Sequence, residues 1–349
     1  MKNVLILGVN GFIGHHLSKY ILERTDWQVY GMDLQSERVS TLLGNPRFHF
    51  VEGDITINLE WVEYHVRKCD VILPLVAIAT PATYVRAPLK VFELDFEANL
   101  PIIRHCVKYK KRVVFPSTSE VYGASRDRQF DPATSELVLG PIHEQRWIYS
   151  CIKQLLDRII WAYGQQGLQF TLFRPFNWIG SGLDSMDDPK EGSSRVLTQF
   201  LGHIVRGEPI KLVDGGTQTR AFTYVDDAVE CLTTIIDNPG GIADGKIYNI
   251  GNPANLYSIR QLAEMMLAVA LARPEYAPTA RNTRIVEVSA MQYYGKGYAD
   301  IPARLPSIEN TSAELGWKPH TDMRAALAAI FDSYAHSLPQ ASALLSRDA

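Results

Sequence analysis

The sequence predicts an α/β fold in which a doubly wound parallel sheet carries a smaller carboxyl-terminal lobe. Short apolar runs alternate with helical patterns through the first half of the chain, which is typical of parallel strands joined by helices. The pattern loosens from about Gly180. We therefore expect residues 1–178 to form the sheet domain, with residues 221–252 returning to it, and residues 179–349 to form mainly the lobe. With 349 residues, the chain is long enough for two such units.

A glycine-rich turn follows the first predicted strand, Asn3 to Leu7. Its three glycines have the spacing GxxGxxG: Gly8, Gly11 and Gly14. Glycine at these positions permits a tight turn, close approach of the backbone to a pyrophosphate, and tight packing of helix on strand. The amino terminus of the following helix, which reaches about Leu22, would receive the phosphate charge. This strand–turn–helix unit predicts a Rossmann-type dinucleotide site.

The second predicted strand, Val29 to Met32, ends at Asp33, about 20 residues beyond the glycines. A carboxylate there would accept hydrogen bonds from both ribose hydroxyls and would repel a 2′-phosphate. This favours NAD over NADP, although Arg38 is close enough in sequence to bind a 2′-phosphate. Asp54, after the next strand, could hydrogen-bond an adenine amino group or form a turn, and the pattern leaves both open.

The remaining elements of the first half keep the alternation of strand and helix. We expect strands over Phe48 to Val51, Val71 to Leu75, Lys111 to Pro116 and Gln169 to Phe173, and helices near Leu59 to Val66, Phe92 to Val107 and Tyr149 to Gly164. The second half begins with a polar loop, Ser181 to Ser194. After it we expect a helix over Arg195 to Val205, a strand over Ile210 to Val213, a helix to about Ile236, a strand over Lys246 to Ile250 that returns to the sheet, and a helix in the tail.

The stretch Ser117-Thr118-Ser119-Glu120 follows the strand that ends at Pro116, where an open α/β sheet places its ligand crevice. Tyr149 and Lys153 stand at i and i+4 on the next helix and project from one face toward that crevice. Lowering a tyrosine pKa from about 10 to about 7 requires roughly 4 kcal/mol, part of which Lys153 and a cationic nicotinamide ring would supply. The tyrosinate could then remove the proton of a secondary alcohol that Thr118 holds.

Composition excludes several classes of function. The net charge is −3, 46% of residues are hydrophobic and 21% are charged, with no basic stripe, so nucleic acid is not an expected partner. No apolar stretch approaches the roughly 20 residues that span a bilayer, and Met1 runs into a strand without a signal-peptide pattern, so we expect a cytoplasmic protein without a membrane partner. The four cysteines are scattered and no metal-ligand cluster is visible, so we expect no metal.

The motifs together resemble a known family. GxxGxxG, Asp33, Thr118, Tyr149xxxLys153, Arg174-Pro175 and Leu315-Gly316-Trp317-Lys318-Pro319 occur in the order found in the extended short-chain dehydrogenase/reductases that act on nucleotide sugars. Longer runs are similar to the UDP-glucuronic acid decarboxylase domains of the ArnA type over nearly all of the chain: residues 71–81, 116–123, 146–150, 170–178 and 293–298. Residues 255–290 match less well. ArnA carries an amino-terminal formyltransferase domain and this sequence begins at the dinucleotide-binding strand, so we expect only the oxidative decarboxylation.

The resemblance implies an activity. Enzymes of this type oxidise UDP-glucuronic acid at the 4-hydroxyl with NAD and release carbon dioxide and NADH, leaving UDP-4-keto-pentose (UDP-β-L-threo-pentopyranos-4-ulose). The product lies on the route to 4-amino-4-deoxyarabinose on lipid A. The resemblance thus implies NAD binding by residues 1–178, UDP-sugar binding mainly by residues 179–349, and a homo-oligomer, a dimer or higher.

The resemblance also implies roles for single residues. The expected catalytic residues are Thr118, Ser119, Glu120, Tyr149, Lys153 and Arg304. Arg304, or a water that it polarises, would protonate the 5-carbon, and Glu120 would lie against the departing carboxylate. The expected substrate-binding residues are Arg146, Asn177, Lys211, Gln218, Arg220 and Tyr298. The expected cofactor-binding residues are Gly8, Asn10, Gly11, Phe12, Ile13, Gly14, Asp33, Asp54, Leu75, Ala77, Thr80, Asn99, Tyr149, Lys153 and Pro175.

Other functions remain as alternatives. A UDP-xylose synthase uses the same residues and returns the hydride to the 4-keto intermediate. A 4,6-dehydratase would carry Thr-Asp-Glu where this chain has Thr118-Ser119-Glu120, and a 4-epimerase would not need Glu120. A non-catalytic, nucleotide-sensing binder would not need Thr118, Tyr149 and Lys153 together. The dehydratase, the epimerase and the binder therefore rank below the decarboxylase and the synthase.

Overall fold

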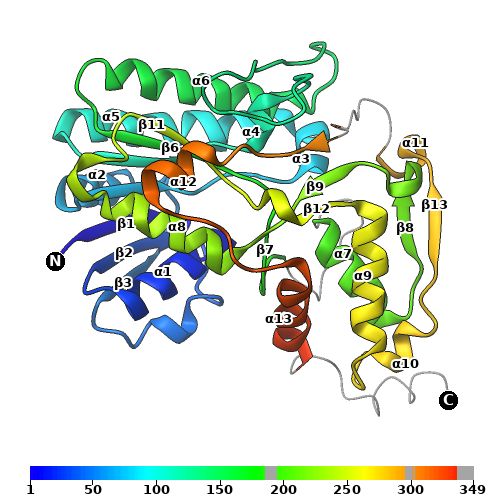
Figure 1. Cartoon of the computed structure of the whole chain (residues 1–349). Helices are drawn as coiled ribbons and strands as arrows, with labels where there is room; N and C mark the ends of the chain where they lie inside the picture. Colours follow the sequence, from blue (N-terminus) through cyan, green and yellow to red (C-terminus); the bar gives the residue numbers. More distant parts are fainter. Residues whose placement is uncertain (185–194, 295–300, 302, 336–349) are drawn as a thin grey trace.

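A seven-stranded parallel sheet forms the centre of the protein (Figure 1). The computed structural model describes residues 1–184, 195–294, 301 and 303–335. In spatial order the strands are β11 (Lys246–Ile250), β6 (Phe170–Pro175), β5 (Arg112–Pro116), β4 (Val71–Pro74), β1 (Asn3–Leu7), β2 (Gln28–Asp33) and β3 (Phe48–Glu52). Neighbours pair in parallel throughout, with Val4 opposite both Val29 and Val71. The doubly wound Rossmann-type α/β fold is therefore confirmed, including the return of β11 to the sheet edge.

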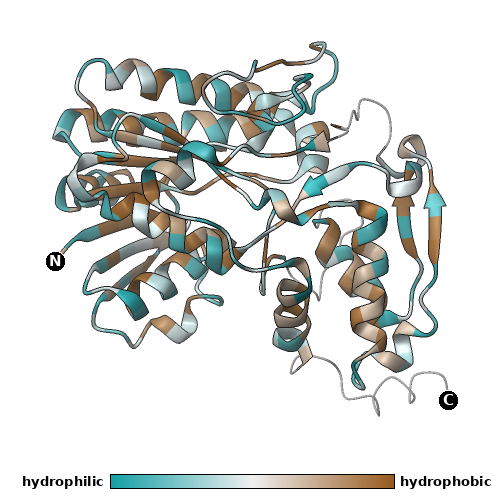
Figure 2. Cartoon of the chain, in the orientation of Figure 1, coloured by the Kyte–Doolittle hydropathy of each residue, from teal (hydrophilic) through white to brown (hydrophobic). Residues whose placement is uncertain are grey.

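Helices cover both faces of this sheet. One face packs against α1 (Phe12–Arg24) and α8 (Val225–Asp237). The other face packs against α2 (Leu59–Lys68), α5 (Asn99–Tyr109) and α6 (Trp147–Gly164), with the short helices α3 (Pro81–Arg86) and α4 (Pro88–Phe92) beside α6. Strands buried on both faces need apolar residues in both directions, and Figure 2 shows the central strands as largely hydrophobic.

One predicted helix has the wrong form. The sequence indicated a single helix over Phe92 to Val107, whereas the chain ends α4 at Phe92, makes a π-helical turn over Glu93–Glu97 and then begins α5 at Asn99. The apolar spacing of the two segments is close to one continuous helical pattern, so the wider turn was not visible in the sequence. The helix expected to begin at Tyr149 begins two residues earlier, at Trp147.

A second apolar core lies in the lobe. Its helices are α7 (Val196–Arg206), α9 (Ile259–Leu271), α10 (Ala277–Ala280) and α13 (Met323–Ala335). Short strands pair around them: β8 (Ile210–Val213) with β13 (Ile285–Val288), β7 (Trp178–Ile179) with β10 (Thr223–Tyr224), and β9 (Thr219–Ala221) with both β12 (Leu256–Ser258) and β14 (Ala303–Arg304). The helices α11 (Ala290–Tyr294) and α12 (Glu309–Leu315) complete the elements. The division at residue 178 stays a prediction.

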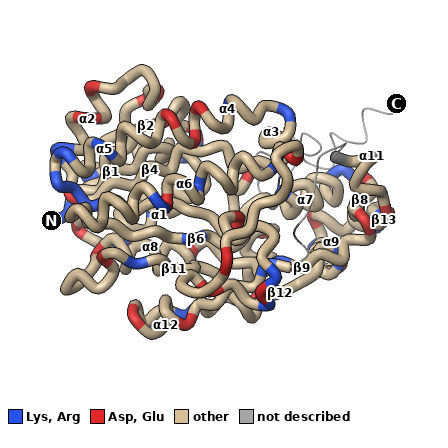
Figure 3. Tube along the Cα trace, turned by 90° about the horizontal axis from the view of Figure 1, so that it is seen from above, with Lys and Arg blue, Asp and Glu red and all other residues tan. Residues whose placement is uncertain are grey.

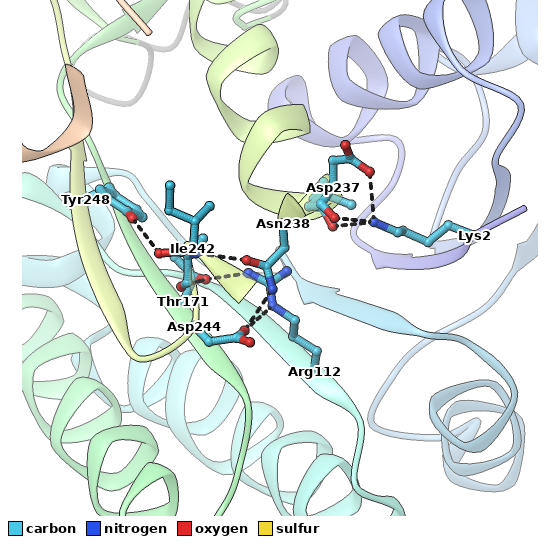
Figure 4. Close-up of polar contacts among 10 residues, drawn as sticks. Lys2, Arg112, Thr171, Asp237, Asn238, Ile242, Asp244 and Tyr248 are labelled. Carbon is cyan, nitrogen blue, oxygen red and sulfur yellow. Dashed lines mark hydrogen bonds and ion pairs between the residues drawn. The ribbon is translucent and has the colours of Figure 1, made fainter. Parts of the chain in front are cut away.

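Polar contacts hold the amino-terminal ends of the strands together (Figure 4). The Arg112 guanidinium donates to Asp244 Oδ1 at 2.9 Å and to Thr171 Oγ1 at 2.6 Å, which ties β5, β6 and the segment before β11. Lys2 Nζ donates to the carbonyl oxygens of Ile236 and Asp237 at the end of α8. These contacts are internal to the fold, and they leave the opposite, carboxyl-terminal ends of the strands for a ligand.

Charged residues of both signs are distributed along the chain in the sheet domain and in the lobe (Figure 3). Within the described ranges, no helix is long and apolar enough to span a membrane. The same residues contain no group of three or more His, Cys, Asp and Glu side chains that could hold a metal ion.

Candidate active site

A cavity of about 370 Å³ lies where the carboxyl ends of the strands meet the lobe. Its lining comes from the ends of β4, β5 and β6, from α1 and α6, and from α7, β8 and β9 of the lobe. Most of the predicted site residues contribute to it: Phe12, Ile13, Leu75, Ala77, Thr118, Ser119, Glu120, Arg146, Tyr149, Lys153, Pro175, Asn177, Lys211, Gln218, Arg220 and Arg304. The fold thus brings residues nearly 300 positions apart in sequence, Phe12 and Arg304, to one space.

The glycine turn after β1 has the tight geometry that its spacing predicts. Gly8 has a φ of +88°, and a Cβ on it would lie 3.0 Å from the backbone nitrogen of Val76. A Cβ on Gly14 would lie 2.5 Å from the carbonyl oxygen of Gly8, so only glycine lets α1 pack this closely on the turn. No side chain caps the amino terminus of α1. Its first backbone N–H groups therefore have no side-chain partner, and they lie at the end of the helix that carries the cavity-lining residues Phe12 and Ile13.

Asp33 lies beside this turn at the end of β2. Its Oδ2 accepts a hydrogen bond from the Asn10 backbone at 2.8 Å, and its Oδ1 accepts one from the Leu34 backbone at 2.8 Å. Burial raises the pKa of Asp33, although the hydrogen bonds from Asn10, Leu34 and Gly11 oppose that rise. Arg38 contacts Asn10, the residue whose backbone donates to Asp33. The Arg38 backbone donates to Asn10 Oδ1 at 2.9 Å, and its guanidinium donates to the Asn10 carbonyl at 3.3 Å.

Tyr149 and Lys153 lie on the buried face of α6 and both line the cavity. Lys153 Nζ donates to the Pro116 carbonyl oxygen at 2.9 Å, which fixes its ammonium at the end of β5. Thr118 hydrogen-bonds to the side chain of Tyr149. The hydroxyl of Thr118 also accepts from the Glu120 backbone at 3.2 Å and caps the 3-10 turn Ser119–Tyr122. The end of β5 and the start of α6 therefore form one hydrogen-bonded unit.

Buried charges act on this unit. Burial raises the pKa of Tyr149 well above its ordinary value, and the carboxylates Asp95 and Glu120 raise it further, while the hydrogen bond from Thr118 lowers it. Burial lowers the pKa of Lys153, and Asp95 and Asp157 act in the opposite direction. In the protein alone Tyr149 is therefore a phenol, and a further positive charge is needed to make it a base near neutral pH.

Glu120 is held between two arginines in the same cavity. Its Oε2 accepts from Arg146 at 3.1 Å and its Oε1 accepts from Arg304 at 3.2 Å, and all three side chains are buried. Burial disfavours the charged form of Glu120, but Arg304 and Arg146 outweigh it and hold the pKa below its usual value. Arg304 comes from β14, which pairs with β9 so that Arg304 lies opposite Arg220. The result is a cluster of guanidinium groups around one carboxylate.

The buried ion pair of Asp157 and Arg174 supports the carboxyl end of β5. Asp157, one helical turn after Lys153, accepts from Ser117 Oγ at 2.7 Å and from the Arg174 guanidinium at 3.3 Å. Ser117 is the residue before Thr118, so this contact fixes the backbone that presents Thr118 to the cavity. Arg174 of the predicted Arg174-Pro175 motif therefore acts on the site from outside the cavity lining.

The lobe side of the cavity presents polar groups from several elements. Asn177 follows β6 with a φ of +41° and donates to the Ala221 carbonyl at 3.3 Å. Lys211 on β8 and Gln218 before β9 line the cavity, and Arg220 donates to the carbonyl oxygens of Thr219 and Ile301. Tyr298, the remaining predicted substrate residue, lies outside the described residues.

Comparison with known proteins identifies the family. Residues 4–251 match the NAD dependent epimerase/dehydratase family. The chain belongs to this family. The PbgP3 protein from Burkholderia pseudomallei, known from a crystal structure, is 64% identical in sequence to this chain. The match covers 97% of this chain and 97% of that chain, and the two structures superpose with a TM-score of 0.89.

More distant members of the epimerase/dehydratase fold show the architecture alone. MoeE5 in complex with UDP-glucuronic acid and NAD is 22% identical, with 96% of this chain and 100% of that chain covered and a TM-score of 0.78. The dTDP-glucose 4,6-dehydratase (rfbB) from Bacillus anthracis str. Ames, in complex with NAD, is 19% identical, with 96% and 97% covered and a TM-score of 0.77. The family model and the 64% identical structure, not these two, confirm the resemblance at the level of the family.

NAD is the cofactor of an epimerase/dehydratase family member, and the residues after β1 and β2 fit it. The glycine turn leaves no room for side chains where a pyrophosphate would approach, α1 begins uncapped, and Asp33 offers a carboxylate at the end of β2. Leu75, Ala77 and Pro175 line the cavity and stay predicted cofactor contacts.

Eight predicted cofactor residues lie outside the cavity lining: Gly8, Asn10, Gly11, Gly14 and Asp33 at the glycine turn and the end of β2, and Asp54, Thr80 and Asn99 elsewhere. Asp54 Oδ1 accepts from the backbone and hydroxyl of Thr56, which is the turn alternative. Thr80 precedes α3. Asn99 is buried and donates to the carbonyl oxygens of Val76, Leu94 and Asp95. Their contacts with NAD remain predictions.

Sequence reasoning missed several residues of this family member's site. Tyr84 on α3 is stacked on Tyr149, and Asp95 in the π-helical turn acts electrostatically on it. Arg195, Gln199 and Tyr293 line the lobe side, where Tyr293 donates to Gln199 at 2.6 Å. Tyr293 stands in the run 293–298 that carried the resemblance, but no role was assigned to it, and the other four belong to no motif with fixed spacing. Tyr84 and Asp95 are separated from Tyr149 by more than 50 residues, so only the packing of α3 and the π-helical turn on α6 reveals them.

Proposed function

We propose that this enzyme carries out the oxidative decarboxylation of UDP-glucuronic acid with NAD as the hydride acceptor. The products would be UDP-4-keto-pentose, carbon dioxide and NADH, and the enzyme would be an NAD-dependent UDP-glucuronate dehydrogenase (decarboxylating). The proposal depends on one observation above all: Arg146 and Arg304 surround Glu120 in the same cavity as Tyr149 and Thr118. An alcohol-oxidising base and a cationic site for a carboxylate are thus next to each other.

Oxidation begins at the 4-hydroxyl of the sugar. Tyr149 accepts its proton, and Thr118, which hydrogen-bonds to Tyr149, holds the same oxygen. Lys153, fixed on the Pro116 carbonyl, keeps a positive charge near the phenolate. When bound, NAD would supply the acceptor for the hydride of the 4-carbon and a positive charge that favours the ionised form of Tyr149. Residues of the glycine turn and Asp33 would hold the dinucleotide.

The new ketone is β to the sugar carboxylate. The bond between the 5-carbon and the carboxyl carbon breaks, carbon dioxide leaves, and the electron pair forms an enolate that the 4-carbonyl stabilises. Hydrogen bonds from Thr118 and the protonated Tyr149 to the 4-oxygen stabilise that enolate. A proton then adds to the 5-carbon, delivered by Arg304 or by a water that Arg304 polarises. Atoms and charges balance without a further reagent.

Glu120 raises the energy of the bound sugar acid but not that of its product. Its pKa is held below the usual value, so it stays ionised next to the substrate carboxylate, and the repulsion disappears when neutral carbon dioxide leaves. Arg304 and Arg146 limit this repulsion enough for the acid to bind. One carboxylate and two guanidinium groups together therefore serve both the binding of the sugar acid and its decarboxylation.

The lobe residues suit a nucleoside diphosphate. Arg220 and Lys211 are cations on the lobe side of the cavity lining, and arginine binds phosphate through two parallel hydrogen bonds. Asn177 and Gln218 would hydrogen-bond the uracil or ribose. The complex of the distant relative MoeE5 with UDP-glucuronic acid and NAD supports a ligand of this class.

We also propose that the enzyme acts in the cytoplasm, where NAD and UDP-sugars are available, as a homo-oligomer of two or more copies. The keto-pentose would supply the lipid A modification that the sequence resemblance implies. Light scattering coupled to gel filtration measures the number of copies directly, and a single chain mass would contradict the oligomer.

The experiment is to incubate the protein with UDP-glucuronic acid and NAD, follow NADH absorbance, and identify the sugar by NMR. We expect NADH and UDP-4-keto-pentose in equal amounts. UDP-xylose without net NADH would instead identify a synthase that returns the hydride. UDP-glucose, which lacks the carboxylate, is the control and should release no carbon dioxide. A dehydrated or epimerised sugar, or no turnover, would refute the proposal.

A further inference from the structure

A buried carboxylate lies behind the catalytic helix. Asp95, in the π-helical turn Glu93–Glu97, is fully buried. Its Oδ1 accepts a hydrogen bond from the Ile78 backbone at 2.7 Å, and its Oδ2 has no hydrogen-bond partner within the part of the chain that the structure describes. A buried, half-satisfied carboxylate is costly to fold, so its presence calls for a physical reason.

The π-helical turn decides where this carboxylate lies. Such turns place an extra residue in a helix and are frequent at functional sites. Here the turn packs on α6, the helix that carries Tyr149 and Lys153. The Ile78 amide belongs to the segment that follows β4 and lines the cavity through Ala77 and Ala79. Asn99 supports the same segment by donating to the Val76 carbonyl at 3.1 Å. Asp95 therefore accepts a hydrogen bond from the cavity-lining segment and stands in a turn that packs on α6.

Asp95 is electrostatically coupled to the catalytic pair. Its charge raises the pKa of Tyr149 and opposes the lowering of the pKa of Lys153 by burial. Burial raises the pKa of Asp95 to about 6, although Lys153 and the Ile78 hydrogen bond act against that rise. The other groups that act on Tyr149 come from different elements: Glu120 after β5, which raises its pKa, and Thr118 and Arg195, which lower it.

We propose that Asp95 is a positioning residue that fixes the segment after β4 through Oδ1 and sets the charge balance of the Tyr149–Lys153 pair through its second oxygen. When Asp95 is ionised, it keeps Lys153 protonated inside the protein and restrains the ionisation of Tyr149. When Asp95 takes up a proton, both effects weaken. The pH range of the reaction is then determined by three coupled groups and not by Tyr149 alone. The choice of Tyr149 as the base rests on the proposed function.

The first test separates charge from packing. Asp95→Asn keeps an acceptor oxygen for Ile78 but removes the charge. We expect the pH profile of kcat/KM for NADH formation to move toward lower pH by roughly half to one unit on both limbs, because the pKa values of Tyr149 and Lys153 both fall. Glu97→Gln is the matched control: Glu97 lies in the same turn, is exposed and carries the same charge, so its profile should not move.

A purely structural role gives a different result. It would lower the height of the Asp95→Asn profile and leave both limbs where they are, and that outcome would refute the proposal. An upward shift, or equal shifts in Asp95→Asn and Glu97→Gln, would refute it as well.

The second test uses the unaltered protein and needs no substrate. The amide resonance of Ile78 should titrate with a midpoint near the pKa of about 6 of Asp95, because protonation weakens the hydrogen bond that it donates. An Ile78 resonance that does not change through this range would refute the proposal even if Asp95→Asn fails to fold. If the protein does not oxidise UDP-glucuronic acid, the proposed function fails, while the Ile78 titration still decides whether Asp95 takes up a proton there.

Discussion

The rings of Tyr84 and Tyr149 are stacked, with centroids 4.6 Å apart and an interplanar angle of 9°. Tyr84 comes from α3 and is buried, and Tyr149 comes from the first turn of α6. The stack covers one face of the Tyr149 ring and restricts its rotation, and the ring belongs to the apolar core on this side of the sheet. The orientation of the proposed base is therefore fixed before any substrate binds.

The stack can be tested without touching the reacting groups. Tyr84→Phe keeps the ring and should retain most of the turnover, whereas Tyr84→Ala should lower kcat by roughly 10- to 100-fold by letting Tyr149 move. Steady-state rates of NADH formation, with a thermal melt of each variant, provide the measurement. Equal rates in Tyr84→Ala and the unaltered enzyme would show that the stack does not position the base.

Tyr149→Phe removes the proposed base and leaves the ring. We expect NADH formation from UDP-glucuronic acid to be abolished, while binding of the UDP-sugar, measured by calorimetry, changes little, since the proposed nucleotide contacts Lys211, Gln218 and Arg220 lie on the lobe side of the cavity. Unchanged turnover in this variant would discard the assignment.

Arg304→Ala leaves Glu120 with only Arg146 as a direct partner among the contacts described above. Losing a buried charge partner should cripple decarboxylation and weaken binding of the sugar acid by about 3 kcal/mol or more. Arg304→Lys keeps the charge without the planar fork and should be intermediate. Carbon dioxide release and the affinity for UDP-glucuronic acid are the two measurements, and activity at the unaltered level in Arg304→Ala would remove this residue from the mechanism.

The stability of the protein should depend on pH through Asp95. Its pKa is about 6 in the folded chain against 3.8 for an ordinary aspartate, so the folded state binds the proton more readily. The stabilisation from Asp95 is therefore full below 3.8 and is lost as pH rises through 6. We compare the free energy of unfolding of Asp95→Asn with that of the unaltered protein at each pH. The difference should favour the variant by roughly 1–3 kcal/mol more at about pH 8 than at about pH 4. Urea denaturation at the two pH values measures the difference, and a constant difference would contradict the raised pKa.

Asp227 should be required for stability and not for chemistry. It is fully buried at the start of α8 and accepts hydrogen bonds from the backbones of His320 and Thr321, at 3.0 and 2.8 Å, and from the Thr321 hydroxyl at 2.7 Å. Asp227→Ala leaves these donors without an acceptor and should cost about 2–4 kcal/mol of unfolding free energy. The neighbouring Asp226 is exposed, so Asp226→Ala serves as the control, with an expected cost below about 1 kcal/mol. Equal losses in both variants would refute this role.

Sequence reasoning succeeded where function depends on local backbone geometry. The spacing of Gly8, Gly11 and Gly14 and the i, i+4 spacing of Tyr149 and Lys153 are properties of one turn and one helix, so they could be read from the chain. The strands Ile210–Val213 and Lys246–Ile250 were predicted with the bounds that the structure shows. Buried apolar runs flanked by turn residues define such strands well.

What the sequence did not show depends on tertiary packing. Asp95 stands in an apolar helical pattern that gives no sign of a π-helical turn, and its partner Ile78 lies 17 residues away in a loop. The contact between Glu120 and Arg304 joins residues 184 positions apart, and only the resemblance to a family suggested it. Periodicity describes single elements, whereas these contacts depend on how elements meet.

The chain passes between sheet and lobe more than once. It enters the lobe after β6, and α8 and β11 return to the sheet. The lobe then continues with β12 and α9, and α12 packs on α8 before α13 rejoins the lobe. No single cut can therefore release the substrate lobe as a separate piece. A chimaera that takes its substrate preference from a relative would need a splice point at each passage, and a recombination event at one site would bring together halves of two incompatible cavities.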